Sequence, residues 1–219
     1  MPLPPQFGCG LESADKLWVG DSIPSSRPGA QSADPSVILR GILAEVSPAS
    51  RWAPVSAWEL ILFIAGVGGF IGVVRMSEPG FIFLLDHANL LFHEASHPIT
   101  GLFSQRLEPY GGTVGQLFFP GSLMVSFWRK GRPLALAVAM IWFSENFLNI
   151  ARYMADARKL DLPIVGGGDH DWNTIFARWN VLQLDDRIAA GVNAAGWLGV
   201  GCAVMWVLWR AWTDRKARG

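Results

Sequence analysis

Long apolar runs, each close to the length that crosses a bilayer, constrain this chain more than any other feature. A transmembrane helix needs about 20 mostly apolar residues. Soluble domains rarely contain such continuous runs, because one face of each of their elements meets water. Four runs meet the requirement: 57–74, 80–103, 133–155 and 188–209. The sequence therefore predicts an all-α, polytopic membrane protein.

The composition agrees with that class and excludes others. Hydrophobic residues make up 51% of the chain and charged residues only 16%, with a formal net charge of zero. This balance gives no electrostatic basis for a nucleic-acid partner. The eleven tryptophans suit a membrane protein, where indole rings favour the lipid–water boundary. The two cysteines, Cys9 and Cys202, do not form the pattern of a disulfide framework.

A fifth run, 113–128, is shorter and contains Pro120. Because the basic turn 129–132 separates it from the next run, we expect it to be a span, which gives about five transmembrane helices. Four spans with a re-entrant 113–128 segment is the alternative. Five spans put the basic turn, Arg75 and the basic residues of 210–219 on one side, and the excess of Lys and Arg predicts that this side is cytoplasmic.

The apolar runs also set the domain boundaries. We expect a largely disordered N-terminal tail at 1–55, because it is rich in Pro, Ser, Gly and Asp, with a short interfacial helix at 37–46. The tail lacks the pattern of a signal peptide. The membrane-embedded helical domain covers 56–212, and a basic tail covers 213–219.

The segment 93–97, His-Glu-Ala-Ser-His, lies inside the second apolar run. Residues four apart are about 40° apart around a helix, so His93 and His97 project from one face. Two imidazoles at this spacing bind one Zn²⁺, while Glu94 beside them takes a proton from the coordinated water. The motif predicts His93 and His97 as metal ligands and Glu94 as the catalytic base.

The position of the motif within an apolar run strengthens this interpretation. Ionisable residues at membrane depth are costly and usually mark a functional site. The alternative is that the motif only hydrogen-bonds to neighbouring helices. Asp86 and Asn89 share the His93 face, and we expect them to contact another helix or to support the site. Haem is disfavoured, because two axial histidines must come from opposite sides of the ring.

The motif and a following Tyr-Gly-Gly-Thr segment at 110–113 resemble the intramembrane zinc metalloproteases of the site-two protease type. The resemblance covers roughly 80–175. It implies zinc bound by His93 and His97 with Glu94 as base, and it implies that 110–115 offers an extended edge to a substrate strand. The Leu-Asp-Gly motif that supplies that family's third ligand is absent here. The chain also resembles uncharacterised bacterial membrane proteins with a His-Asp-Trp segment.

A third ligand must therefore come from elsewhere in the chain. His170 is the first candidate, because three glycines (166–168) free its loop to fold inward and the flanking carboxylates could orient the imidazole. Glu145 is the second, at a depth similar to that of His93, and Asp156 is the third. The alternative for His170 is an ordinary polar turn before an interfacial helix at 172–182.

Together these features predict a membrane-embedded zinc metallopeptidase that hydrolyses peptide bonds. Its partners would be the lipid bilayer and protein or peptide substrates in or near the membrane, with no nucleic acid. We expect it in the inner (plasma) membrane of a bacterium. The alternative is a non-proteolytic integral membrane protein with a structural or metal-binding role.

Overall fold

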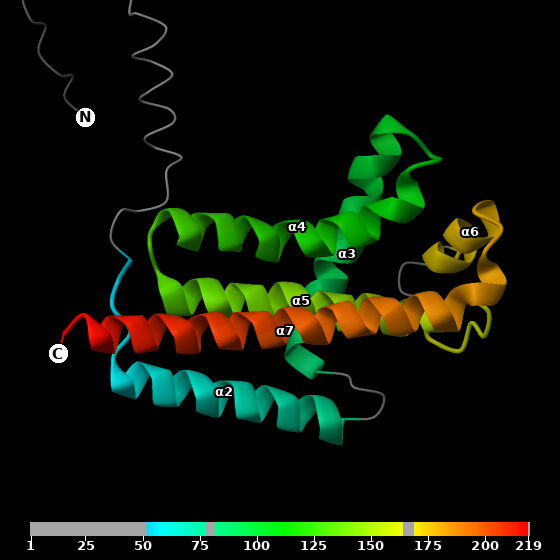
Figure 1. Cartoon of the computed structure of the whole chain (residues 1–219). Coiled ribbons are helices and arrows are strands. Elements are labelled where there is room, and N and C mark those ends of the chain that lie inside the picture. Colours follow the sequence, from blue (N-terminus) through cyan, green and yellow to red (C-terminus); the bar gives the residue numbers. More distant parts are fainter. Residues whose placement is uncertain (1–51, 78–81, 164–168, 219) are drawn as a thin grey trace, which may run out of the picture. The chain divides into compact units, whose positions relative to one another are not determined.

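The structure is a computed structural model that describes residues 52–77, 82–163 and 169–218. The predicted tail up to residue 51, its interfacial helix and the three glycines lie outside these ranges. Within them, every regular element is a helix and no strand occurs, which confirms the all-α prediction (Figure 1). The elements are α2 (Ala57–Met76), α3 (Phe83–Phe103), α4 (Glu108–Arg129), α5 (Pro133–Ala155), α6 (Asp171–Arg178), the 3-10 turn η1 (Leu182–Leu184) and α7 (Asp185–Lys216).

Three stretches of the described chain are long and apolar enough to cross a membrane. They are Ala57–Met76, Pro133–Ala155 and Leu182–Lys216. α3 and α4 have the length, but polar residues and glycines lower their hydropathy. α7 continues through Lys216, past the predicted boundary at residue 212. Membrane association is therefore supported, whereas five spans are not established.

The longest helices pack side by side. α5 contacts α7 over most of its length, and α4 lies against α5 (Figure 1). A Cβ atom at Gly199 of α7 would overlap with the Ser144 hydroxyl of α5. Small residues at such positions let two helix backbones approach closely, which favours packing inside a membrane.

Three segments meet at one end of this helix group. The Ala53 N–H donates to the Gly131 carbonyl at 2.9 Å, and the Val55 N–H donates to Oδ2 of Asp214 at 2.9 Å. The start of α2, the α4–α5 turn and the end of α7 therefore lie together, as predicted for the basic turn and the basic C-terminal segment. We call this the basic end (52–56, 129–132 and 210–218).

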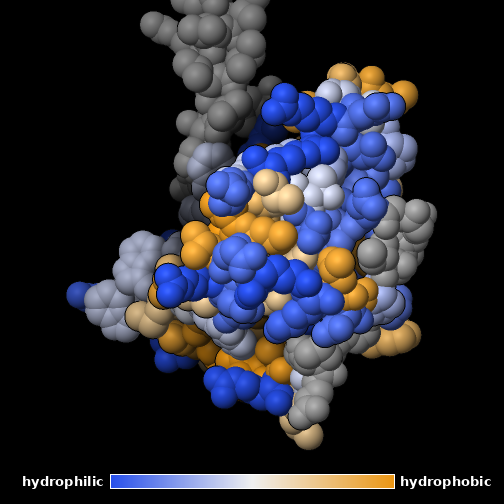
Figure 2. All heavy atoms as spheres, turned by 90° about the vertical axis from the view of Figure 1, so that its right-hand side faces the viewer, coloured by the Kyte–Doolittle hydropathy of each residue, from blue (hydrophilic) through white to orange (hydrophobic). Residues whose placement is uncertain are grey.

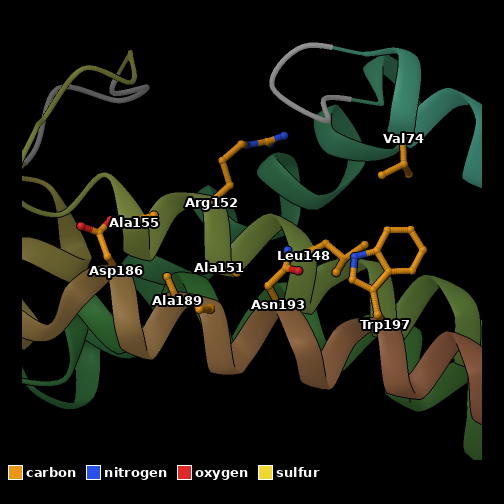
Figure 3. Close-up of a pocket in the computed structure, with 10 residues that line it drawn as sticks. Val74, Leu148, Ala151, Arg152, Ala155, Asp186, Ala189, Asn193 and Trp197 are labelled. Atoms are coloured by element: carbon orange, nitrogen blue, oxygen red, sulfur yellow. The ribbon is translucent and has the colours of Figure 1, made fainter.

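The opposite end, the site end, comprises the last turns of α5, α6 and the first turns of α7. Val74 of α2 lies away from the basic end, beside Trp197, and lines a pocket of about 280 Å³ that extends from there to Ala155 and Asp186 at the site end (Figure 3). The prediction that Arg75 shares a side with the basic turn is therefore wrong. α2 starts at the basic end, and 20 residues of helix carry the chain about 30 Å away from it.

α3 does not run between the two ends as the other long helices do. Near its start, Asp86 bonds to Asn149 and Arg152 in the last turns of α5. Its later turns cross the first turns of α4, so α3 lies obliquely within the site-end half (Figure 1). The buried polar face of α3 explains this path, since most of its partners, including Asn149, Arg152 and Asp171, are in that half.

Hydrophilic side chains gather across the site end, with hydrophobic ones around and between them (Figure 2). A surface of this kind suits helix ends and connections that emerge from a bilayer toward water. The site end therefore combines a polar surface with the buried polar face of α3.

Candidate metal centre

The structure brings His93 and His97 of α3 together with Asp171, the first residue of α6. Oδ2 of Asp171 is 2.9 Å from Nε2 of His93 and 3.3 Å from Nε2 of His97. His93 is buried, and the side chains of His97 and Asp171 are 18% and 10% exposed. One ligand atom from each residue lies within 4.8 Å of the other two, so the group could hold a metal ion.

Core packing of α6 places Asp171. Trp172, Ile175 and Phe176 are buried on one face of this helix, in a cluster with Ile150 and Met154 of α5. This face fixes the rotation of the helix about its axis. The first residue of α6 then projects toward α3.

A second set of hydrogen bonds orients the two imidazoles. Nδ1–H of His97 donates to the Glu108 carbonyl at 3.0 Å. Nδ1 of His93 lies 3.0 Å from Oε1 of Gln116 and donates to it. Each neutral ring then directs the Nε2 lone pair at Asp171, which is how metal-binding histidines are usually held.

When both rings are neutral, this arrangement places electron pairs against electron pairs unless a cation lies between them. A neutral His97 that donates through Nδ1 has no proton on Nε2, yet Nε2 lies 3.3 Å from a carboxylate oxygen. A metal ion among the three atoms removes the repulsion. Two ligands on a tetrahedral zinc at about 2.0–2.1 Å are roughly 3.4 Å apart, close to the separations found here.

Glycines on α4 allow this close approach. A Cβ at Gly112 would overlap with the His93 ring, and one at Gly115 would overlap with the Ser96 hydroxyl. Gln116, one turn beyond Gly112, therefore reaches His93. The prediction of an extended substrate edge at 110–115 is wrong, because these residues form the first turns of α4 and their backbone groups are used within the helix.

Glu94 lies beside the group and is half-buried. Its carboxylate interacts electrostatically with the His93 imidazole and the Tyr153 hydroxyl. Among the residues that the structure describes, none forms a hydrogen bond or an ion pair with this carboxylate. Its oxygens are therefore available to a bound molecule, as the role of a base requires.

His170, the first candidate for third ligand, lies next to the group but outside it. Its Nδ1 accepts the Asn173 N–H at 3.2 Å, which caps α6, and its Nε2 is 3.5 Å from Oδ2 of Asp156. Burial lowers the pKa of the His170 imidazole, which favours the neutral form that can accept this bond. The residue thereby helps to hold Asp171 at the start of α6.

Asp156 and Glu145, the other candidates, have different partners. Asp156 accepts the backbone N–H groups of Asp161 at 3.0 Å and Leu162 at 3.1 Å, so it shapes the loop before α6. Oε2 of Glu145 accepts from the Asn89 amide at 2.7 Å. Asn89 thus contacts another helix, as expected, and Glu145 is paired within the membrane domain rather than directed at the histidines.

Sequence reasoning missed two members of this centre. Asp171 was considered only as a neighbour that orients His170, whereas the structure reverses the two roles. Gln116 gave one signal that could have been used, since it lies four residues after Gly112 and therefore on the same face of α4. No signal in the sequence shows whether Asp171 or His170 faces the two histidines, because the two residues are adjacent in the chain.

The arrangement can be compared with known proteins at three levels. No family model matches the chain, no curated protein matches it, and no solved structure matches it. The function must therefore be argued from the centre itself.

Proposed function

We propose that this chain is a membrane-embedded zinc metallopeptidase, with zinc held by His93, His97 and Asp171. The observation that carries the proposal is the convergence of the Nε2 atoms of His93 and His97 on one carboxylate oxygen, with each Nδ1 at hydrogen-bond distance from an acceptor. Hydrogen bonding between helices, the alternative for this motif, does not require that convergence.

The donor set favours zinc. Two imidazoles and one carboxylate are the protein ligands of several catalytic zinc sites, which keep the fourth position open for water or substrate. The partial exposure of His97 is consistent with an open position. A purely structural zinc site would instead have four protein ligands.

The residues around the ligands can carry out hydrolysis. A zinc ion bound here would lower the pKa of a coordinated water and polarise a peptide carbonyl. Glu94 accepts a proton from the attacking water and later passes it to the leaving amine. Gln116 and the Glu108 carbonyl keep the two imidazoles in the tautomer that binds metal.

The substrate class follows from the position of the centre. α3 lies within the site-end half of the helix group, so we propose protein or peptide substrates in or near the membrane. This agrees with the resemblance to site-two proteases, with Asp171 in place of that family's Leu-Asp-Gly aspartate. The same resemblance suggests the inner membrane of a bacterium.

We further propose four crossing helices, α2, α4, α5 and α7, with α3 embedded from the site end. This replaces the five-span count, because α2 leads away from the basic end and α4 leads back to it. The basic end then faces the cytoplasm, since its Lys and Arg residues flank three of the crossings.

Cysteine labelling in cells tests this topology, in a background without the two native cysteines. Arg75→Cys and Lys159→Cys should react together with a membrane-impermeant maleimide added outside. Lys130→Cys and Arg215→Cys should react only after the membrane is opened. Reaction of Arg75→Cys together with Lys130→Cys would favour the five-span model and contradict four crossings.

Metal removal tests the proposed activity. The purified protein in liposomes should cleave fluorescent casein or synthetic transmembrane peptides. Cleavage should stop after treatment with 1,10-phenanthroline and return when zinc is added, because the coordinated water is lost with the metal. A protein that binds stoichiometric zinc but cleaves no member of this peptide set would instead fit the non-proteolytic alternative.

A further inference from the structure

A tyrosine hydroxyl, that of Tyr153 on α5, lies at the edge of the metal-binding group. The Tyr153 ring meets the His93 ring edge-on, with centroids 5.8 Å apart, and lies against the His170 ring at 4.1 Å. Its oxygen accepts the Asp171 N–H at 3.2 Å. Contacts on two sides and at the tip thus fix the position of the hydroxyl oxygen.

The Tyr153 hydroxyl accepts one hydrogen bond but donates none to a described residue. Among the residues that the structure describes, no acceptor lies within hydrogen-bond distance of its proton. The hydroxyl lies next to the third ligand, Asp171, and within electrostatic range of Glu94. Tyr153 is half-buried, which leaves its proton accessible to a bound molecule.

We propose that Tyr153 is a catalytic residue whose hydroxyl donates a hydrogen bond to the carbonyl oxygen of the scissile peptide as negative charge develops there. This inference rests on the proposed peptidase function. The phenolic proton stays on Tyr153, so no bond is made or broken at this residue. A donor fixed in place before the reaction stabilises developing charge most effectively where water is excluded.

A purely positioning role gives different expectations. If Tyr153 only held the Asp171 backbone, its loss would weaken metal binding and leave the metal's other interactions unchanged. If Tyr153 instead donates to the reacting oxygen, its loss has the opposite effect. Metal binding stays the same, while the metal-bound protein binds more weakly to a ligand that places a negatively charged oxygen near Tyr153. The two roles can therefore be separated with a small metal-binding probe.

The experiment compares cobalt-loaded wild-type protein with Tyr153→Phe and with Tyr110→Phe. The chain has two tyrosines, and the Tyr110 ring packs at 6.0 Å from that of Trp179, which follows the last residue of α6 and lies at the opposite end of that helix from Asp171; Tyr110 is therefore a matched control. Cobalt affinity is measured first, from the visible spectrum. Acetohydroxamic acid is then titrated in, and its charged oxygen reports on a nearby hydrogen-bond donor.

We expect all three proteins to bind cobalt equally and Tyr153→Phe to bind acetohydroxamic acid about 10-fold or more weakly, as for the loss of a hydrogen bond to a charged group. Equal hydroxamate affinity in all three would overturn the proposal. So would weaker cobalt binding by Tyr153→Phe with unchanged hydroxamate affinity, which would show a positioning role. Failure of the wild type to bind cobalt would overturn the proposed metal function itself and this inference with it.

Discussion

Asp171→Ala is expected to abolish stoichiometric zinc, as are His93→Ala and His97→Ala. Each substitution leaves two protein ligands, which are too few to hold zinc firmly. The loss should exceed the roughly 10–100-fold that follows removal of a residue which only orients a ligand. His170→Ala is expected to fall within that smaller range. His170 caps α6, so its loss would affect the metal only indirectly, through the position of Asp171.

Elemental analysis and competition with a chromogenic chelator measure these effects. Asp169→Ala and His87→Ala are matched controls, because both residues are exposed and lie close in sequence to the ligands. Helical content and thermal unfolding show whether each variant is folded. A folded Asp171→Ala that keeps stoichiometric zinc, together with a His170→Ala that loses it, would make His170 the third ligand.

Glu94→Gln is expected to keep zinc and to lose peptidase activity. The amide has nearly the same size and shape as the carboxylate but cannot accept a proton at neutral pH. General-base catalysis typically contributes 10²–10⁴-fold, so turnover should fall by roughly that factor. The zinc content should not change, since Glu94 is not one of the three residues that converge on the metal position.

Turnover and zinc content are measured on the same preparation. Glu108→Gln is the control, because Glu108 is exposed and contacts His97 only through its backbone carbonyl, which the substitution keeps. Retained cleavage in Glu94→Gln would exclude Glu94 as the base. A parallel loss of zinc would instead indicate that Glu94 contributes to metal binding.

The helical fold and half of the centre could be predicted from local sequence. The length of an apolar run depends only on neighbouring residues, and so does the geometry of a helical i, i+4 pair. That is why the helices and the shared face of His93 and His97 appear as expected. The direction of α3 could not be predicted, because it depends on polar contacts such as that of Asn89 with Glu145, 56 residues away.

The third ligand depends on tertiary structure as well. Asp171 lies 74 residues after His97, and its direction is set by the buried face of α6, which Ile175 and Phe176 form against α5. A rotation of α6 by one position, about 100°, would exchange the roles of Asp171 and His170. The rotation of α6 about its axis, which decides whether Asp171 or His170 faces α3, cannot be read from the sequence alone.

X-ray absorption at the zinc edge of the purified protein tests the central claim most directly. With His93, His97 and Asp171 as ligands, the spectrum should show nitrogen and oxygen neighbours at about 2.0–2.2 Å and outer-shell scattering from two imidazoles. Three imidazoles would contradict Asp171 as the third ligand, and a protein purified without any bound zinc would contradict the metal centre.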